Sequence, residues 1–238
     1  MKASFFKGIF FTTLFVLSAF TWTQAQEPST MKLPEPVKKG GLTIMEAFSK
    51  RASERSWADK ELSSQDLSNL LWAGNGINRP DIKKRTAPSA MNAQDVDIYV
   101  IMKSGAYLYD AVNHALNLVS EGDHRSEVAM SMAGPKPSDR TPATSGAAAP
   151  VRPMPAASII LVSDLSKFRM GSDESKKEIG IIDSAIVSEN ISVFCAGNGL
   201  TNVPRASINK DALKVLLKLK DTQYIVLENA VGYPTETK

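Results

Sequence analysis

Apolar residues at helical spacing predict four helices along the chain. The predicted helices span residues 42–50, 63–76, 173–195 and 209–219. The second follows a capping-box sequence at residues 63–66, and Leu67, Leu70 and Leu71 mark its buried face. The third carries the longest apolar stripe of the chain, and Asn209 is placed to cap the fourth.

Shorter apolar runs predict strands. The predicted strands span residues 97–102, 106–109, 158–162 and 222–231. The first two are joined by a two-residue turn at Ser104–Gly105, and Tyr107 and Tyr109 are expected to share one face because successive side chains alternate. The last two are apolar enough to be fully buried. Helices and strands in a chain of 238 residues predict one α/β or α+β domain.

The N-terminal segment differs from this domain. Residues 1–25 resemble a secretory signal peptide, in which Lys2 and Lys7 precede an apolar run and a small-residue cleavage site. A membrane anchor is the alternative, but the run is shorter than the roughly 20 residues of a spanning helix. We therefore expect an exported, periplasmic protein without stable membrane insertion after cleavage. Residues 26–41 have no apolar period and are interpreted as an N-terminal arm.

Composition excludes several classes of site. The formal net charge of +3 gives no indication of nucleic-acid binding. Cys195 is the only cysteine, cannot form an internal disulfide, and lies in an apolar run typical of a buried core residue. His114 and His124 have no cysteine partners, so no zinc spacing exists, and neither lies in a recognisable Ser–His–Asp context. No metal site is expected.

A polar stretch at residues 85–94 lies between the second helix and the first strand. Pro88 fixes its own φ, and Ser89, Asn92 and Gln94 offer neutral donors and acceptors in a row. Such a loop can wrap the polar edge of a flat, buried ligand. A polar turn without a ligand is the other interpretation.

A second polar stretch, Arg51–Arg55, follows the first predicted helix. That helix takes its apolar stripe from Leu42, Ile44, Met45 and Phe48. Arg51 and Arg55 flank Ser53, and guanidinium groups match phosphate oxygens bidentately. The long third helix ends in a turn containing Gly197 and Gly199, where a bare backbone can approach a ring closely. The same glycines can cap the helix, and both roles can hold together.

In this order and at this distance, the two polar stretches resemble the FMN-dependent nitroreductase family, in its SagB-like oxidoreductase branch. The family pattern Arg-x-Ser-x-Arg is matched by Arg51–Arg55, and Pro-Ser-(Ser/Ala)-x-Asn-x-Gln is matched by Pro88–Gln94. The resemblance covers residues 42–234. It implies an α+β, nitroreductase-like three-layer fold, with a central mixed or antiparallel sheet flanked by helices, in an intertwined homodimer. The domain would span residues 42–238.

The resemblance also implies the cofactor and the reaction. FMN would carry hydride between NAD(P)H or another small-molecule donor and a nitroaromatic, quinone or similar acceptor, so no catalytic side chain is assigned. Arg51 and Arg55 would bind the phosphate and ribityl chain, with Ser53 at the pyrimidine edge or ribityl chain. Pro88, Ser89, Ala90 and Asn92 would reach the flavin of the other subunit. The full set is Arg51, Ala52, Ser53, Arg55, Pro88, Ser89, Ala90, Asn92, Gly199 and Leu200.

The chain departs from the family pattern in two places. Residues 134–157 are rich in Pro, Ala, Ser, Thr and Gly, which predicts a flexible insertion either over the flavin pocket or in solvent. Many relatives carry further basic residues after the final turn, here Gly232–Pro234, whereas this sequence stops at Lys238, so Arg51 and Arg55 would have to carry most of that charge. Export also separates the protein from most pyridine nucleotide. Two alternatives therefore remain open: a SagB-like dehydrogenase of a peptide-derived heterocycle, and a non-catalytic flavin-binding or scaffold protein.

Overall fold

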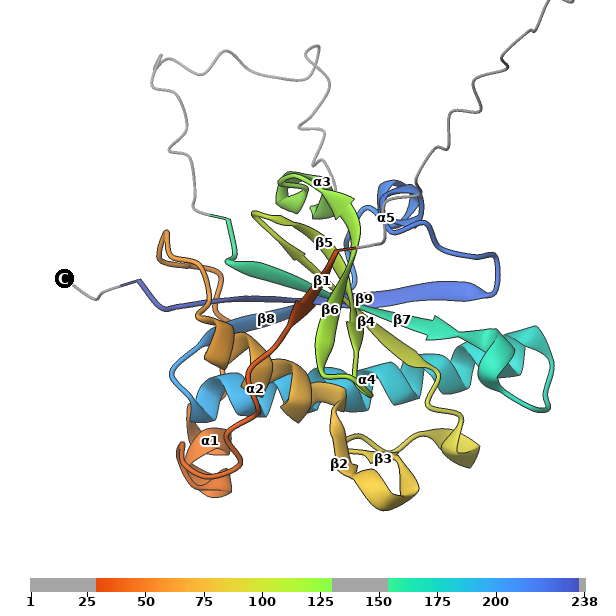
Figure 1. Ribbon diagram of the computed structural model, residues 1–238, viewed down its shortest axis with the longest axis horizontal. Coiled ribbons are helices and arrows are strands. Elements are labelled where there is room, and N and C mark those ends of the chain that lie inside the picture. Colours follow the sequence, from red (N-terminus) through yellow and green to blue (C-terminus); the bar gives the residue numbers. More distant parts are fainter. Residues whose placement is uncertain (1–28, 130–153, 236–238) are drawn as a thin grey trace, which may run out of the picture.

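The computed structural model describes residues 29–129 and 154–235. They form an antiparallel sheet of seven strands in the order β1-β6-β5-β4-β7-β9-β8, with helices on both faces (Figure 1). The predicted signal peptide at residues 1–25 and residues 134–153 of the predicted insertion lie outside the described residues. The α+β fold with three layers is confirmed.

The sheet and a small separate ribbon account for the strands. The sheet strands are β1 (Thr30–Lys32), β4 (Val96–Met102), β5 (Gly105–Asp110), β6 (Ala115–Glu121), β7 (Ala157–Asp164), β8 (Thr201–Arg205) and β9 (Gln223–Gly232). The ribbon pairs β2 (Ile77–Arg79) with β3 (Lys84–Arg85). The helices are α1 (Ile44–Lys50), α2 (Ser64–Asn75), α3 (Arg125–Val128), α4 (Asp173–Gly197) and α5 (Lys210–Leu216). Single 3₁₀ turns lie at Pro80–Ile82, Ala90–Asn92 and Leu165–Lys167.

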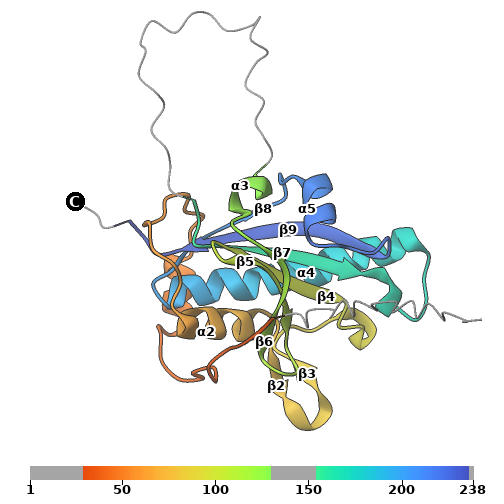
Figure 2. The same cartoon turned by 45° about the horizontal axis from the view of Figure 1, so that its top comes forward.

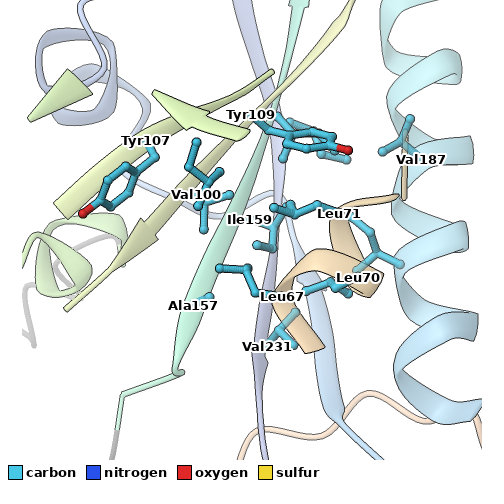
Figure 3. Close-up of a cluster of buried hydrophobic side chains, with 14 of the residues drawn as sticks. Leu67, Leu70, Leu71, Val100, Tyr107, Tyr109, Ala157, Ile159, Val187 and Val231 are labelled. Carbon is cyan, nitrogen blue, oxygen red and sulfur yellow. The ribbon is translucent and has the colours of Figure 1, made fainter. Parts of the chain in front are cut away.

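The two faces of the sheet bury different side chains, because successive strand residues point to opposite faces. Ile98 and Val100 of β4 belong to the core shared with α2 and α4, whereas Tyr99 and Ile101 pack with residues near α3 and α5. Figure 3 shows Leu67, Leu70 and Leu71 of α2 between the strands and Val187 of α4. The sheet is therefore the middle layer, with α2 and α4 on one side and α3 and α5 on the other (Figure 2).

Helix α4 runs across one face of the sheet and organises that side of the molecule. Its N-cap Ser172 accepts a hydrogen bond from the backbone N–H of Ser175, and acidic residues occupy its first turn. By length and composition α4 could cross a membrane. In this fold it packs on the sheet instead, with Val187, Ile191 and Cys195 buried. The predicted third helix and the buried state of Cys195 are confirmed.

Three predictions at the edges of elements are corrected. The hairpin turn is Lys103–Ser104, because Gly105 already pairs with Met102 and its φ of 155° brings the backbone close to Ser120. The predicted insertion ends earlier, because Ala156 and Ala157 are buried and Ala157 begins β7. Inside the predicted arm, Thr30–Lys32 forms β1 on β6.

Neither β1 nor β6 was predicted from the sequence. All three β1 residues are exposed, so the strand has no apolar alternation and is held at the sheet edge by backbone pairing. Strand β6 is fully buried only at its first two residues, Ala115 and Leu116, and half-buried along most of the remainder. A strand whose side chains are mostly half-buried leaves a weak period in the sequence.

Candidate cofactor site

The Arg51–Arg55 stretch leaves α1 with its side chains directed to solvent. A capping box starts α1, because the Glu46 carboxylate accepts from the Thr43 N–H at 2.8 Å and the Thr43 hydroxyl accepts from the Glu46 N–H. Arg51, Ser53 and Arg55 are exposed, and their side chains make no hydrogen bond or ion pair within the described ranges. Two guanidinium groups and one hydroxyl are therefore available to an anion.

Backbone hydrogen bonds fix this stretch beside the end of α4. The Glu54 N–H donates to the Asn202 carbonyl at 3.1 Å, and the Leu42 N–H donates to the Gly197 carbonyl at 2.9 Å. Gly199 has a φ of 71° and open space above its Cα, while Leu200 is buried and its N–H donates to the Cys195 carbonyl at 3.0 Å. The glycine-cap interpretation is confirmed, and the backbone of Gly199 stays open to a ligand.

The structure thus brings Arg51–Arg55 together with Gly199 and Leu200. The cleft between them, lined by Ala52, Glu54 and Thr201 among others, holds only about 20 Å³ in a single chain. Hollows of about 330 and 370 Å³ lie elsewhere, and none of the predicted site residues lines them. A ring system at this place would lie across the surface and not inside one chain.

The Pro88–Gln94 loop has a backbone that is unusual for non-glycine residues. Met91, Asn92 and Gln94 have φ values of 53°, 53° and 49°, in the left-handed region. Such conformations cost about 1–3 kcal/mol each and persist where surrounding contacts fix them. Pro88 and Asn92 are exposed, and Ser89 and Ala90 are half-buried. The loop is therefore held in one shape, with Pro88 and Asn92 facing solvent.

Hydrogen bonds within the loop and to neighbouring elements hold that shape. The Gln94 N–H donates to the Ser89 Oγ at 2.9 Å, and the Gln94 side chain accepts from Arg85 Nε at 3.0 Å and donates to the Lys83 carbonyl at 2.9 Å. The Ala90 N–H donates to the Asp183 carboxylate of α4 at 2.9 Å. Sequence reasoning missed Arg85 and Asp183 as supports of this loop. Asp183 is the one carboxylate in a stretch of α4 made of apolar and small residues, and this contrast could have marked it as a functional position.

A second buried carboxyl group lies behind the loop. Asp95 is fully buried, and its Oδ2 accepts a hydrogen bond from Ser163 Oγ at 2.6 Å. Burial raises the pKa of Asp95 to about 7, with further contributions from a hydrogen bond to Asp183 and from its charge. Gly180 of α4 makes the approach possible, since a Cβ there would lie 2.7 Å from Ser163 Cβ.

The predicted residues fall into two clusters, one beside the middle of α4 and one beside its C-terminal end. The Pro88–Gln94 loop docks at Asp183. The Arg51–Arg55 stretch docks at Asn202, just beyond the end of α4 at Gly197. At 1.5 Å per helical residue, Asp183 and Gly197 are about 21 Å apart. In Figure 1, α1 and the β2–β3 ribbon accordingly lie at different places along α4. One chain therefore does not join Pro88, Ser89, Ala90 and Asn92 to the arginine cluster.

Apolar side chains face solvent on both helices that carry these clusters. On α1 and the residues before it, the exposed fractions are 38% for Leu42, 58% for Ile44, 72% for Met45 and 52% for Phe48. On α4 they are 45% for Ile181 and 59% for Ile182. The apolar stripe predicted for the first helix exists, but in the single chain only Ala47 of α1 is buried. Such a set of large apolar side chains is typical of an interface.

Solved structures share this fold. A protein of Ralstonia eutropha JMP134 that has been assigned to the nitroreductases is 26% identical, with a TM-score of 0.73 over 89% of this chain and 95% of that one. The Escherichia coli microcin synthetase complex McbBCD is similar at 16% identity, with a TM-score of 0.61 over 95% of this chain and 85% of that one. A nitroreductase family protein of Clostridium difficile 630 gives 18% identity, with a TM-score of 0.55 over 82% and 87%. The last two likenesses show the fold alone.

The family comparison covers most of the chain. No curated protein matches it significantly. The model of the nitroreductase family matches residues 48–233, a range that includes both Arg51–Arg55 and Pro88–Gln94. This protein therefore belongs to the nitroreductase family.

Proposed function

We propose that this family member is an FMN-dependent oxidoreductase that works as a homodimer, with each flavin held by both subunits. Hydride passes from NAD(P)H or another small-molecule donor to a nitroaromatic, quinone or similar acceptor. FMN supplies the hydride chemistry when bound. The side chains of this protein bind it, orient it and exclude water around it.

One observation carries the proposal: the two polar clusters lie about 21 Å apart along α4, at 1.5 Å per residue, with exposed apolar side chains on α1 and α4. A two-fold axis that sets two α4 helices antiparallel and passes midway between Asp183 and Gly197 places Asp183 of one helix beside Gly197 of the other. The Pro88–Gln94 loop of one subunit then meets the Arg51–Arg55 stretch of its partner. The apolar side chains between them become the interface.

The residues present fit FMN. Arg51 and Arg55 have free guanidinium groups for the phosphate, and Ser53 offers a hydroxyl to the ribityl chain or ring edge. Gly199 presents an open backbone to the ring. The rigid loop at Asn92 offers amide groups to the polar edge of the ring from the other subunit. The buried apolar contacts of the dimer would keep bulk water from the ring.

The first test is the absorption spectrum of the purified protein, with the released cofactor identified by chromatography. FMN is expected, and bleaching by NADH or NADPH tests the donor. Replacing Arg51 and Ser53 together with alanine should empty the site. A variant that stays fully yellow would remove the assignment of these residues. A flavin that neither donor nor acceptor turns over would favour the non-catalytic alternative.

A complementation experiment tests the shared site. One chain carries Arg51→Ala with Arg55→Ala, and a second, differently tagged chain carries Asn92→Ala with Ser89→Ala. Each homodimer should bind FMN weakly, whereas the purified heterodimer has one intact and one doubly altered site and should bind one FMN per two chains. If heterodimers bind no more FMN than either homodimer, the composite site is wrong.

A second reaction is favoured by one observation, the fold that this chain shares with a microcin synthetase component. In that reaction the bound flavin would oxidise a heterocycle derived from a peptide. Reduction of FMN by a thiazoline or oxazoline peptide in the absence of NAD(P)H separates the two. Export is part of the proposal, and the mature chain in the periplasmic fraction is expected to begin at Gln26 by N-terminal sequencing.

A further inference from the structure

Two buried carboxyl groups meet behind the Pro88–Gln94 loop. Asp95, directly before β4, is fully buried, and Asp183 of α4 is 3% exposed. The Oδ2 of Asp95 is satisfied by Ser163, but its Oδ1 has no partner among the described residues if both groups are ionised. Asp95 and Asp183 lie within hydrogen-bonding reach of each other, so a proton on one of the carboxyl groups allows a hydrogen bond between them.

Asp183 is also the anchor of the loop. Its two oxygens lie 2.9 and 3.2 Å from the Ala90 nitrogen, so its carboxylate accepts the backbone N–H directly before the left-handed residues Met91 and Asn92. A hydrogen bond to a charged acceptor is stronger than one to a neutral acceptor. Asp183 therefore fixes the loop at the point where its strained backbone begins.

We propose that Asp183 is a positioning residue for the Pro88–Gln94 loop, and that one proton shared with Asp95 keeps the two carboxyl groups together behind the loop. Loss of that proton places two negative charges side by side in the interior and weakens the hold on Ala90. The effect on flavin binding rests on the proposed function, whereas the effect on the loop does not.

The other charged groups around the pair are already engaged. Lys167, in the 3₁₀ turn after β7, is paired with Asp97 of β4 at 2.6 Å. Arg85 of β3 binds the Gln94 side chain and the Asn75 carbonyl, and Asp164 of β7 accepts from Ser166. Within the described part of the chain, Asp183 is the charged group that acts on the pKa of Asp95. Asp95 therefore loses its proton as the pH rises through about 7.

Hydrogen exchange of the flavin-free protein tests the anchor. In Asp183→Ala the amides of the Pro88–Gln94 loop should exchange about ten-fold faster or more, because a hydrogen bond to a charged group is lost. Asp183→Asn keeps an acceptor oxygen and a donor toward Asp95, and should retain protection. Ser184→Ala, at the buried neighbouring position of α4, is the matched control and should exchange as wild type.

The proton shared by Asp95 and Asp183 is tested by measuring the loop at different pH values. After correction for intrinsic exchange rates, loop protection and FMN affinity of the wild type should both fall as the pH rises through about 7. Asp95→Asn donates permanently to Asp183 and still accepts from Ser163, so it should keep the low-pH behaviour throughout. A pH dependence that persists in Asp95→Asn would overturn the shared proton.

The outcomes separate the two proposals. Unchanged loop exchange in Asp183→Ala would overturn the positioning role of Asp183. Faster loop exchange with unchanged FMN affinity would instead overturn the assignment of the loop to the cofactor, while Asp183 remains its anchor. If Asp183→Ala does not fold, the pH profiles of Asp95→Asn and Asp183→Asn still decide whether the two carboxyl groups share a proton.

Discussion

Glu228 is a single residue on which the stability of the sheet depends. Its side chain is fully buried in β9, and Arg205 of β8 binds it with two hydrogen bonds, Nε to Oε2 at 2.8 Å and a terminal nitrogen to Oε1 at 3.0 Å. Burial raises the pKa of Glu228, and the positive charge of Arg205 opposes that rise. The guanidinium group therefore favours the ionised form of a buried carboxyl group between two strands.

Removing this partner should destabilise the protein strongly. Arg205→Ala leaves Glu228 buried without compensation, which typically costs about 3–5 kcal/mol. Because the pKa of Glu228 then lies still further above its unfolded value, stability is retained at low pH and lost as the pH rises. Urea unfolding at pH 5 and pH 8 should show the larger loss at pH 8. Equal losses at both pH values would contradict this account, and Arg205→Met with Glu228→Leu should recover stability.

Site residues that are close together in the sequence could be predicted, whereas those that meet only in the folded chain could not. Arg51, Ser53 and Arg55 were found because their chemistry is compressed into five neighbouring residues, and Pro88–Gln94 was found for the same reason. Asp95 and Asp183 were not paired, because they lie far apart in the sequence and meet only when α4 crosses the sheet. A buried carboxyl pair has no short spacing that periodicity can detect.

At the scale of elements, Gly180 sets how closely α4 approaches β7. A Cβ at this position would lie 2.7 Å from Ser163 Cβ, which forces the helix or the strand to move. Glycine inside a helix otherwise lowers stability by about 1 kcal/mol relative to alanine. In Gly180→Ala, the clash with Ser163 should therefore lower the stability of the protein, whereas the better helix propensity of alanine should raise it.

Gly180→Ala should lower the unfolding temperature despite the better helix former. The clash displaces Ser163 from Asp95, so loop exchange at Pro88–Gln94 should also rise. Gly197→Ala is the matched control on the same helix, since its Cβ would meet Ala47 at 3.4 Å, an ordinary contact. An unfolding temperature at or above wild type for Gly180→Ala would show that the helix can shift without cost.

His114 helps to hold the segment that follows β1, at Pro34, against Ser68 of α2. The Ser68 hydroxyl donates to the Pro34 carbonyl at 2.6 Å and accepts from His114 Nε2 at 2.7 Å. The Tyr109 hydroxyl lies 2.9 Å from Nδ1, so Nδ1 accepts its proton and the neutral ring satisfies both contacts. Burial lowers the pKa of His114, which favours this neutral form.

Acid should therefore loosen the N-terminal segment. The folded pKa of His114 lies below its unfolded value, so its contribution to stability is present above about pH 6.5 and is lost as the pH falls below it. The difference in unfolding temperature between wild type and His114→Gln should shrink from pH 7.5 to pH 5. Limited proteolysis between β1 and α1 should rise in parallel for the wild type. A difference that is constant with pH would show that His114 stays neutral throughout.

At the scale of the whole molecule, the elements of the hydrophobic core could be predicted from the sequence. The homodimer was implied only by the family resemblance. Helices α2, α4 and α5 and strands β4, β5, β7 and β9 follow the apolar periods, because each buries one face or both in the same chain. Helix α1 has an equally clear period, yet its apolar side chains are exposed. Periodicity reports that a face is to be buried and does not say which chain covers it.

That distinction yields the last prediction. Ile182→Glu and Met45→Glu place a charge on residues that are 59% and 72% exposed in the single chain, so folding of the chain should be little affected. In the proposed dimer the same charges are desolvated without a partner. Both variants should be monomeric by light scattering and should lose FMN, although neither residue belongs to the polar clusters.

Val215→Glu provides the control for this prediction. Val215 is 79% exposed on α5, which covers the opposite face of the sheet, so the same charge there should leave both the dimer and the flavin in place. Dimeric, fully loaded Ile182→Glu would show that α4 is not in the interface. Monomers that keep FMN would show that one chain completes the site alone, and the separation of its two halves along α4 would then need a different explanation.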